Sequence, residues 1–110
     1  MTMHLTKIVQ KWFKSQQVGG LVLPDGWWGR PYDGQHSLTA IEESEDTLTI
    51  VLDRVLTLRF EGLKSIKTQT SELTFGPFQR LIFDWESFGD DGNRGTREYE
   101  TGEVKILSAP

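Results

Sequence analysis

LTIVLDRVLTLRF, residues 48–60, carries apolar side chains at even-numbered positions on both sides of Asp53-Arg54-Val55. Side chains of a β-strand alternate between its two faces, so this period of two predicts two strands that each have one apolar face. The even-numbered apolar residues are Leu48, Ile50, Leu52, Leu56, Leu58 and Phe60. We therefore predict that these side chains line a common interior.

The shared even numbering also limits how the two strands connect. A two-residue turn would pair Leu52 with Val55, and it would bring the following polar residues to the apolar face. A three-residue loop pairs Leu52 with Leu56 and keeps the apolar residues together, because a slip of one residue turns a strand over. The sequence favours this loop, and a single long strand bent at Arg54 is the alternative. Against the loop, neither glycine nor asparagine stands where a left-handed residue is usual.

Alternation and turn residues predict further strands. One precedes the hairpin and four follow it, over residues 38–43, 63–69, 72–75, 79–86 and 103–107. The strand that contains RLIFDW, residues 80–85, is the best candidate for the centre of the sheet, because it is apolar on one face and partly apolar on the other. Residues 87–102 are polar and rich in glycine, which predicts a long exposed hairpin loop or a partly disordered segment.

An amphipathic helix is predicted from near Thr6 to near Gln17. Apolar residues recur there at helical spacing, and lysines fall on the opposite side. The Gly19-Gly20 pair is predicted to end this helix. The expected fold is one domain of the α+β class, with an N-terminal amphipathic helix packed on a mostly antiparallel, curved β-meander or half-barrel.

Composition excludes several classes of function. The chain has 110 residues, no cysteine and a net charge of −4. The missing cysteines exclude disulfides and thiolate chemistry, and the acidic balance argues against nucleic acid as a partner. No apolar run is long enough to span a bilayer, and the first residues lack the pattern of a signal peptide. We therefore expect a cytoplasmic protein with no membrane partner.

PDGWWGRPYDGQH, residues 24–36, is where we expect a binding function. Its Pro-Asp-Gly and Asp-Gly groups predict two bends with a short extended piece between them. Tryptophan, tyrosine and arginine are enriched at the hot spots of protein interfaces, and indole faces attract guanidinium groups. The candidate binding residues are Trp27, Trp28, Arg30, Tyr32, Asp33 and His36.

A structural role for the same side chains is the alternative. We favour Trp27 as a buried anchor at the open end of the sheet. For Trp28, the roles of buried anchor and exposed binding contact are equally supported by the sequence. Arg30 would then stack on an indole and pair with Asp33 or Asp84. Adjacent residues of an extended segment point in opposite directions, so the two indoles are not expected to share one pocket.

LPDGWWGRPYDGQH, residues 23–36, followed by the alternating residues 48–60, resembles a group of short uncharacterised bacterial proteins. The motif is Gly-Trp-x-Gly-Arg-Pro-Tyr-Asp, here residues 26–33, with a nearby histidine and a strand that ends in Phe-Asp-Trp, here residues 83–85. The resemblance covers residues 21 to about 86, and Gly34 stands where the group carries asparagine. It implies a bacterial protein, and it implies no catalytic role because no activity is assigned to the group.

No catalytic, metal or cofactor site is predicted. His4 and His36 lack the spacing of a metal-binding pair, and residues 90–93, Asp-Asp-Gly-Asn, lack the alternating ligands of a calcium loop. Asp84 and Glu86 share one face of a predicted strand. Two acids at this spacing are more often solvated than catalytic, and no nucleophile motif or phosphate-binding loop accompanies them.

Three functions remain to be distinguished. The first is a non-enzymatic protein-interaction module that uses the aromatic and arginine side chains of residues 24–36 to bind a protein partner or to self-associate. The second is a small-ligand binding protein with a pocket rimmed by Arg30, Tyr32 and His36. The third is an enzyme that uses His36 with Asp33 or Asp84. We favour the first.

Overall fold

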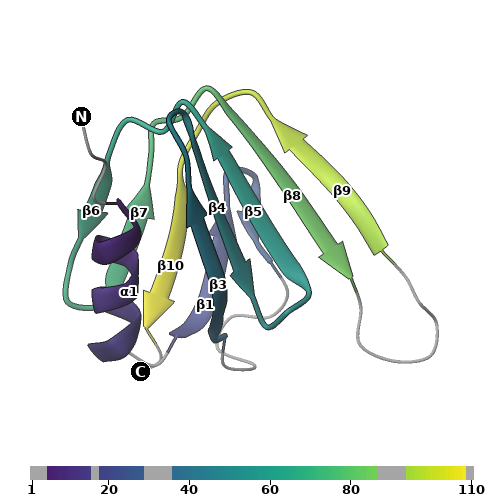
Figure 1. The fold of residues 1–110 in the computed structure, drawn as a ribbon. Helices are drawn as coiled ribbons and strands as arrows, with labels where there is room; N and C mark the ends of the chain where they lie inside the picture. Colours follow the sequence, from purple (N-terminus) through teal and green to yellow (C-terminus); the bar gives the residue numbers. More distant parts are fainter. Residues whose placement is uncertain (1–4, 16–17, 29–35, 87–93, 109–110) are drawn as a thin grey trace.

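Two five-stranded antiparallel sheets pack face to face in this protein (Figure 1). The computed structural model describes residues 5–15, 18–28, 36–86 and 94–108. The first sheet has the order β2 (Gly26–Trp27), β1 (Val18–Leu23), β10 (Val104–Ser108), β7 (Glu72–Phe75) and β6 (Ile66–Thr68). The second has the order β3 (Leu38–Glu43), β4 (Thr47–Leu52), β5 (Leu56–Glu61), β8 (Arg80–Glu86) and β9 (Arg94–Tyr99).

The hairpin of β4 and β5 has the register that the even-numbered apolar pattern predicts. Each apolar residue of one strand lies opposite an apolar residue of the other: Leu52 with Leu56, Ile50 with Leu58, and Leu48 with Phe60. All of these side chains are buried. The predicted three-residue loop and the common interior are therefore confirmed.

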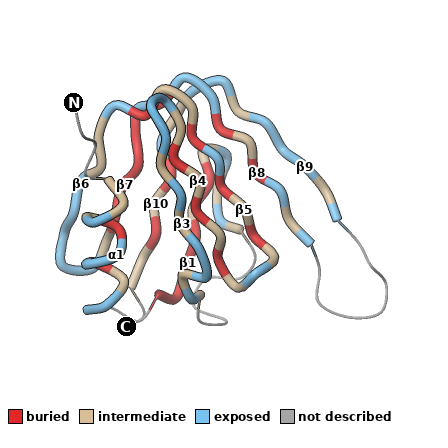
Figure 2. The backbone as a smooth tube through the Cα atoms, viewed as in Figure 1, coloured by how far each residue is buried: buried red, intermediate tan, exposed pale blue. Residues whose placement is uncertain are grey.

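Aromatic rings join the two sheets across the core. Phe60 of β5 stacks on Phe75 of β7, with ring centroids 5.0 Å apart and ring planes 11° apart. Phe78 meets Phe60 edge-on at 5.6 Å. Because β5 and β7 belong to different sheets, these rings connect the two layers. Figure 2 shows that buried residues run along the facing strands β4, β5, β7, β8 and β10.

The predicted N-terminal helix is α1 (Leu5–Ser15), which contacts the edge strands β3 and β6 of the two sheets. Its buried residues are Val9 and Trp12. The indole Nε1 of Trp12 donates a hydrogen bond to the carbonyl oxygen of Gln69 at 2.9 Å. At the other end of the helix, the backbone N and the Oγ1 of Thr6 donate to Oε1 of Glu43, at 3.2 and 2.9 Å. The helix therefore closes one open side of the sandwich (Figure 1).

The structure confirms the α+β class, the N-terminal helix and the antiparallel strands, but it places the strands in two sheets. A single curved meander or half-barrel would pair successive strands along the whole chain. Instead, β6 and β7 leave the sheet that contains β5, and β8 returns to pair with β5. Neither sheet closes on itself among the described strands. Alternation fixes the buried face of a strand and not its neighbours, so it could not distinguish these arrangements.

Three local predictions are wrong. Gly19 and Gly20 lie inside β1 and do not terminate the helix. The central strand of the second sheet is β5, whereas β8 lies between β5 and β9. Residues 94–99 form the edge strand β9, although a loop or partly disordered segment was predicted over residues 87–102. Residues 87–93 of that prediction lie outside the described residues. An edge strand needs little apolar surface, because one face and one edge stay in contact with water.

A Leu58→Ala substitution tests the shared core. Leu58 is fully buried in the central strand β5, and removal of a buried leucine side chain costs about 2–5 kcal/mol. We expect the free energy of unfolding, measured by urea denaturation, to fall by an amount in this range. The matched control is Arg59→Ala, because Arg59 is the next residue and faces solvent; its cost is expected to stay below about 1 kcal/mol. Equal costs for the two variants would contradict the assignment of the buried face.

Candidate functional site

The structure places the described candidate residues at two separate positions. Trp27 and Trp28 lie at the side of the sandwich where β2 approaches β9, and His36 lies beside the turn between β4 and β5. Arg30, Tyr32 and Asp33 are outside the described residues. Their predicted contribution to binding therefore stays a prediction.

Trp28 anchors the side of the sandwich opposite the helix. Its ring meets Phe83 edge-on, with centroids 4.9 Å apart and planes at 76°, and it lies 5.4 Å from the ring of Trp85. The guanidinium carbon of Arg97 lies 5.4 Å from the centroid of the Trp28 ring. Such a cation–π contact contributes about 0.5–1 kcal/mol at an exposed site. Trp28 therefore links the segment after β2 to strands β8 and β9 of the other sheet.

Trp27 points to the opposite side of the chain from Trp28, and its side chain is 42% exposed. A β-carbon added at Gly20 of β1 would lie 2.6 Å from Cζ3 of Trp27, so the indole rests directly on the glycine backbone. The prediction that Trp27 is a buried anchor is therefore wrong, because Trp28 has that role. The expectation that the two indoles do not share a pocket is confirmed. Gly20 was missed as a functional position, and nothing near it in the sequence indicated that an indole covers it.

A polar bridge connects the two sheets beside Trp28. The phenol of Tyr99 donates a hydrogen bond to Oδ1 of Asp25 at 2.9 Å. Nη1 of Arg97 lies 4.0 Å from Oδ2 of the same carboxylate. Burial raises the pKa of the Tyr99 phenol, Arg97 acts in the opposite direction, and the hydrogen bond to Asp25 raises the pKa again. Arg97 and Tyr99 were missed because they belong to the segment that was predicted as a loop.

His36 is paired with Asp53 at the turn between β4 and β5. Its Nδ1 lies 2.6 Å from Oδ2 of Asp53, and each side chain is 18% exposed. Oδ1 of Asp53 accepts a hydrogen bond from the backbone N of Ser37 at 2.8 Å. The backbone N of His36 donates to the carbonyl oxygen of Val18 at 2.8 Å. His36 and its carboxylate partner thus join the hairpin turn to β1 of the other sheet.

This pair supports a left-handed turn that contains no glycine. Asp53 and Arg54 have φ values of 55° and 65°, a conformation that costs roughly 1–2 kcal/mol for a residue with a β-carbon. The backbone N of Asp53 donates to the carbonyl oxygen of Ser37 at 3.0 Å, and that of Arg54 donates to Oγ1 of Thr39 at 2.9 Å. These bonds hold the turn, so the loop forms without the expected glycine or asparagine. The absence of glycine from this turn could have indicated that the left-handed backbone at Asp53 is stabilised by other residues.

The acidic partners expected for His36 were Asp33 and Asp84. Asp33 lies outside the described residues, and Oδ1 of Asp84 accepts a hydrogen bond from Oγ1 of Thr96 at 2.6 Å, on the outer face of the second sheet. His36 is therefore held by a third carboxylate, that of Asp53, which the sequence did not single out.

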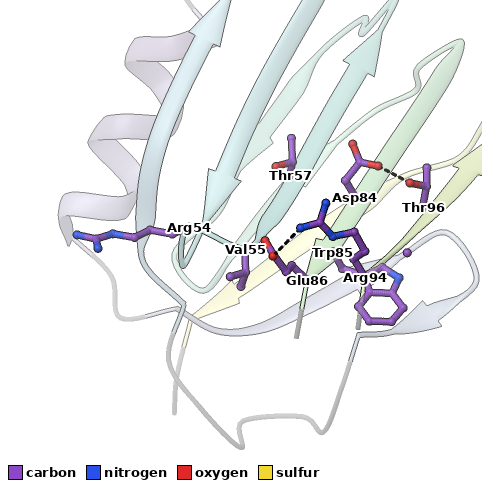
Figure 3. Close-up of a pocket in the computed structure, with 9 residues that line it drawn as sticks. Arg54, Val55, Thr57, Asp84, Trp85, Glu86, Arg94 and Thr96 are labelled. Carbon is purple, nitrogen blue, oxygen red and sulfur yellow. Dashed lines mark hydrogen bonds and ion pairs between the residues drawn. The ribbon is translucent and has the colours of Figure 1, made fainter. Parts of the chain in front are cut away.

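A shallow groove of about 440 Å³ lies on the outer face of the second sheet, beside the turn between β4 and β5 (Figure 3). It contains the two acids considered as a catalytic pair, Asp84 and Glu86. Both are exposed, and Oε1 of Glu86 accepts a hydrogen bond from Nη2 of Arg94 at 3.0 Å. Figure 3 shows that Arg54, at the edge of the groove, points away from the two acids. Each carboxylate is bound by a residue of the neighbouring strand β9. The two acids therefore form solvent-exposed cross-strand pairs of the kind that stabilise a sheet. The lining residues are Arg54, Val55, Thr57, Asp84, Trp85, Glu86, Arg94, Gly95 and Thr96.

Comparison with known proteins gives no match: no family model, no curated protein and no solved structure is similar to the chain. The resemblance to a bacterial group therefore stays a prediction. In the described part of the chain, no three His, Asp or Glu residues lie close enough together to hold a metal ion. No helix in the same part is long and apolar enough to cross a membrane.

An Asp53→Ala substitution tests the turn. It removes the acceptor for the His36 ring and for the backbone N of Ser37, so we expect a loss of about 1–3 kcal/mol in the free energy of unfolding. Asp53→Asn retains an acceptor oxygen and tolerates the left-handed conformation, so its loss should be smaller. Arg54→Ala is the control, because Arg54 has the same backbone conformation and an exposed side chain. If Asp53→Ala and Arg54→Ala destabilise the protein equally in urea denaturation, the turn does not depend on the His36–Asp53 pair.

The bridge beside Trp28 is tested by titrating Tyr99 in a Tyr32→Phe chain, in which Tyr99 is the remaining tyrosine. Because the pKa of Tyr99 is raised by folding, the associated stability is complete below the pKa of an unfolded tyrosine and is lost as the pH rises through the folded-state pKa. We expect Asp25→Asn to lower the pKa measured by phenolate absorbance and Arg97→Gln to raise it. Shifts in the reverse directions would show that the bridge does not form in solution.

Proposed function

We propose that this protein is a non-enzymatic protein-interaction module that binds its partner through Trp27. The observation that carries the proposal is the exposure of this indole: it is 42% exposed although it lies against the backbone of β1 at Gly20. Tryptophan is among the residues most enriched at interface hot spots. An indole that is already fixed in place loses little conformational freedom when a partner covers it.

Two neighbouring side chains extend the surface around Trp27. Val22 lies opposite Trp27 in the pairing of β1 with β2, and Leu107 lies opposite Gly20 in the pairing of β1 with β10. Side chains alternate along a strand, so both belong to the face that carries Trp27, and both are half-buried. We call Trp27, Val22 and Leu107 the Trp27 patch. Covering the exposed part of an indole removes on the order of 100 Å² from water and contributes about 2 kcal/mol.

A protein partner suits this surface better than a small ligand. The Trp27 patch lies on the outer face of a sheet, whereas small ligands bind in concave sites that enclose most of their surface. The alternative pocket rimmed by Arg30, Tyr32 and His36 stays a prediction, because only His36 is described. The pairing of His36 with Asp53 gives that histidine a structural role and does not support the alternative.

Photo-crosslinking from position 27 tests the proposal. A photoreactive benzoyl-phenylalanine replaces Trp27 in the full chain, and we expect irradiation in the native cell extract to give an adduct of discrete mass. The matched control carries the same group in place of Ile82, a half-buried residue that faces outward on the second sheet. Unlabelled wild-type chain should compete for the adduct, and Trp27→Ala should compete roughly tenfold less well or worse.

Two outcomes would refute this function. One is an adduct pattern that is the same from positions 27 and 82. The other is equal competition by the wild-type chain and by Trp27→Ala. Circular dichroism of Trp27→Ala establishes that the variant is folded, so that a loss of competition reports on the Trp27 patch.

A further inference from the structure

The strand β9 forms one edge of the second sheet, and among the described strands none pairs with its outer row of backbone groups. All six of its residues pair with β8, and β9 stands last in the order of the second sheet. Figure 1 shows β9 as the outermost strand, on the side of the sandwich away from α1. The outer edge of such a strand presents N–H and C=O groups that another strand can pair with.

Charges on β9 are arranged symmetrically about Thr96. Arg94 and Glu98 lie two residues before and after Thr96, so all three side chains project from the same face of the sheet. This is the outer face, because Thr96 and Asp84 lie opposite each other and are joined by a hydrogen bond in the groove. The side chains of Arg94 and Glu98 are 75% and 54% exposed.

We propose that β9 pairs antiparallel with β9 of a second copy of this chain, about a two-fold axis at Thr96. Such an axis places each residue before Thr96 opposite the residue at the same distance after it in the other copy. Arg94 of each copy then lies opposite Glu98 of the other, which forms two cross-strand ion pairs. Opposite charges that face each other across a pair of strands stabilise the pairing, and like charges destabilise it.

Other two-fold registers within β9 are less favourable. An axis at Arg97 brings two guanidinium groups face to face, and an axis at Glu98 does the same with two carboxylates. An axis at Gly95 pairs only residues 94–96 of the strand and leaves Arg94 opposite threonine. Charged residues normally protect an edge strand against association. On β9 they select one register, because symmetry about Thr96 makes them complementary.

The ion pairs that already exist within each chain extend this pattern. Arg94 is paired with Glu86 at 3.0 Å, and Glu98 is paired with Arg80. In the dimer, four charged side chains would therefore follow one another across the joined sheets with alternating sign. They are Glu86 and Arg94 of one copy, then Glu98 and Arg80 of the other. The sheet that contains β9 has five strands in each copy, so the two copies together would form one continuous sheet of ten strands. Since the contact is confined to one short strand, we expect the weak affinity that is typical of small interfaces.

A charge-reversal cycle tests the pairing by sedimentation over a wide range of concentrations of the full chain. Arg94→Glu and Glu98→Arg should each raise the dimer dissociation constant roughly tenfold or more, because each places like charges opposite each other twice. The double variant should return to within about threefold of the wild type. The reversals also break the pairs with Glu86 and Arg80, so a mere loss of stability would be greatest in the double variant.

A cysteine at the axis gives an independent measurement. The chain contains no cysteine, so Thr96→Cys introduces one thiol per chain, and the two thiols would meet at a Cα distance that a disulfide can span. Mild oxidation should give a covalent dimer much faster than for Thr49→Cys, a control on β4 of the same sheet. Adding Arg94→Glu to the Thr96→Cys chain should slow the reaction.

Each result decides for or against the pairing, separately from the proposed function. A wild-type chain that stays monomeric at every concentration, a double variant that fails to recover, or Thr96→Cys oxidising no faster than Thr49→Cys would overturn it. Trp27→Ala should leave dimerisation unchanged, because Trp27 lies on the other sheet. Loss of crosslinking from position 27 with an intact dimer would thus refute the proposed function and leave this inference standing.

Discussion

The stacked contact between Phe60 and Phe75 is the interaction on which the arrangement of the two sheets depends. Phe60 comes from the central strand of one sheet and Phe75 from a strand of the other, so their contact requires both apolar faces to be present together. Neither sheet could be stable alone, because each would expose its apolar face to water. The register of β4 and β5 brings Phe60 to this face together with the other buried even-numbered residues.

The two open sides of the sandwich are closed by different means. On one side, α1 spans the edge strands β3 and β6, fixed by the hydrogen bonds of Thr6 and Trp12. On the other side, the ring of Trp28 packs on Phe83 and Trp85. Thus α1 contacts the edge strands β3 and β6, whereas no described strand pairs with the outer edge of β9. This asymmetry is the basis of the proposed pairing of β9 with a second copy of the chain.

Residues that looked alike in the sequence have divided roles in the structure. Trp28 and His36 act in packing and in the turn, and Trp27 is left at the surface. The binding residues could therefore be predicted as a group but not assigned individually. Which of the two tryptophans is buried depends on which side of residues 26–28 faces β8 and β9. These strands are distant in the chain, so the sequence around residue 27 does not indicate which side they cover. The same holds for Asp53, because its partner His36 is separated from it in the sequence by β3 and β4.

The local features could be predicted from the amino-acid sequence: the strands of residues 48–60 and their register, the amphipathic helix, and the buried face of each. These follow from side-chain periodicity, which a strand or helix has whatever surrounds it. Three other features became evident in the folded protein: β6 and β7 join another sheet, polar residues 94–99 form a strand, and a left-handed turn is built without glycine. Those outcomes depend on partners distant in the chain. A backbone adopts a locally unfavourable conformation where such partners supply its hydrogen bonds.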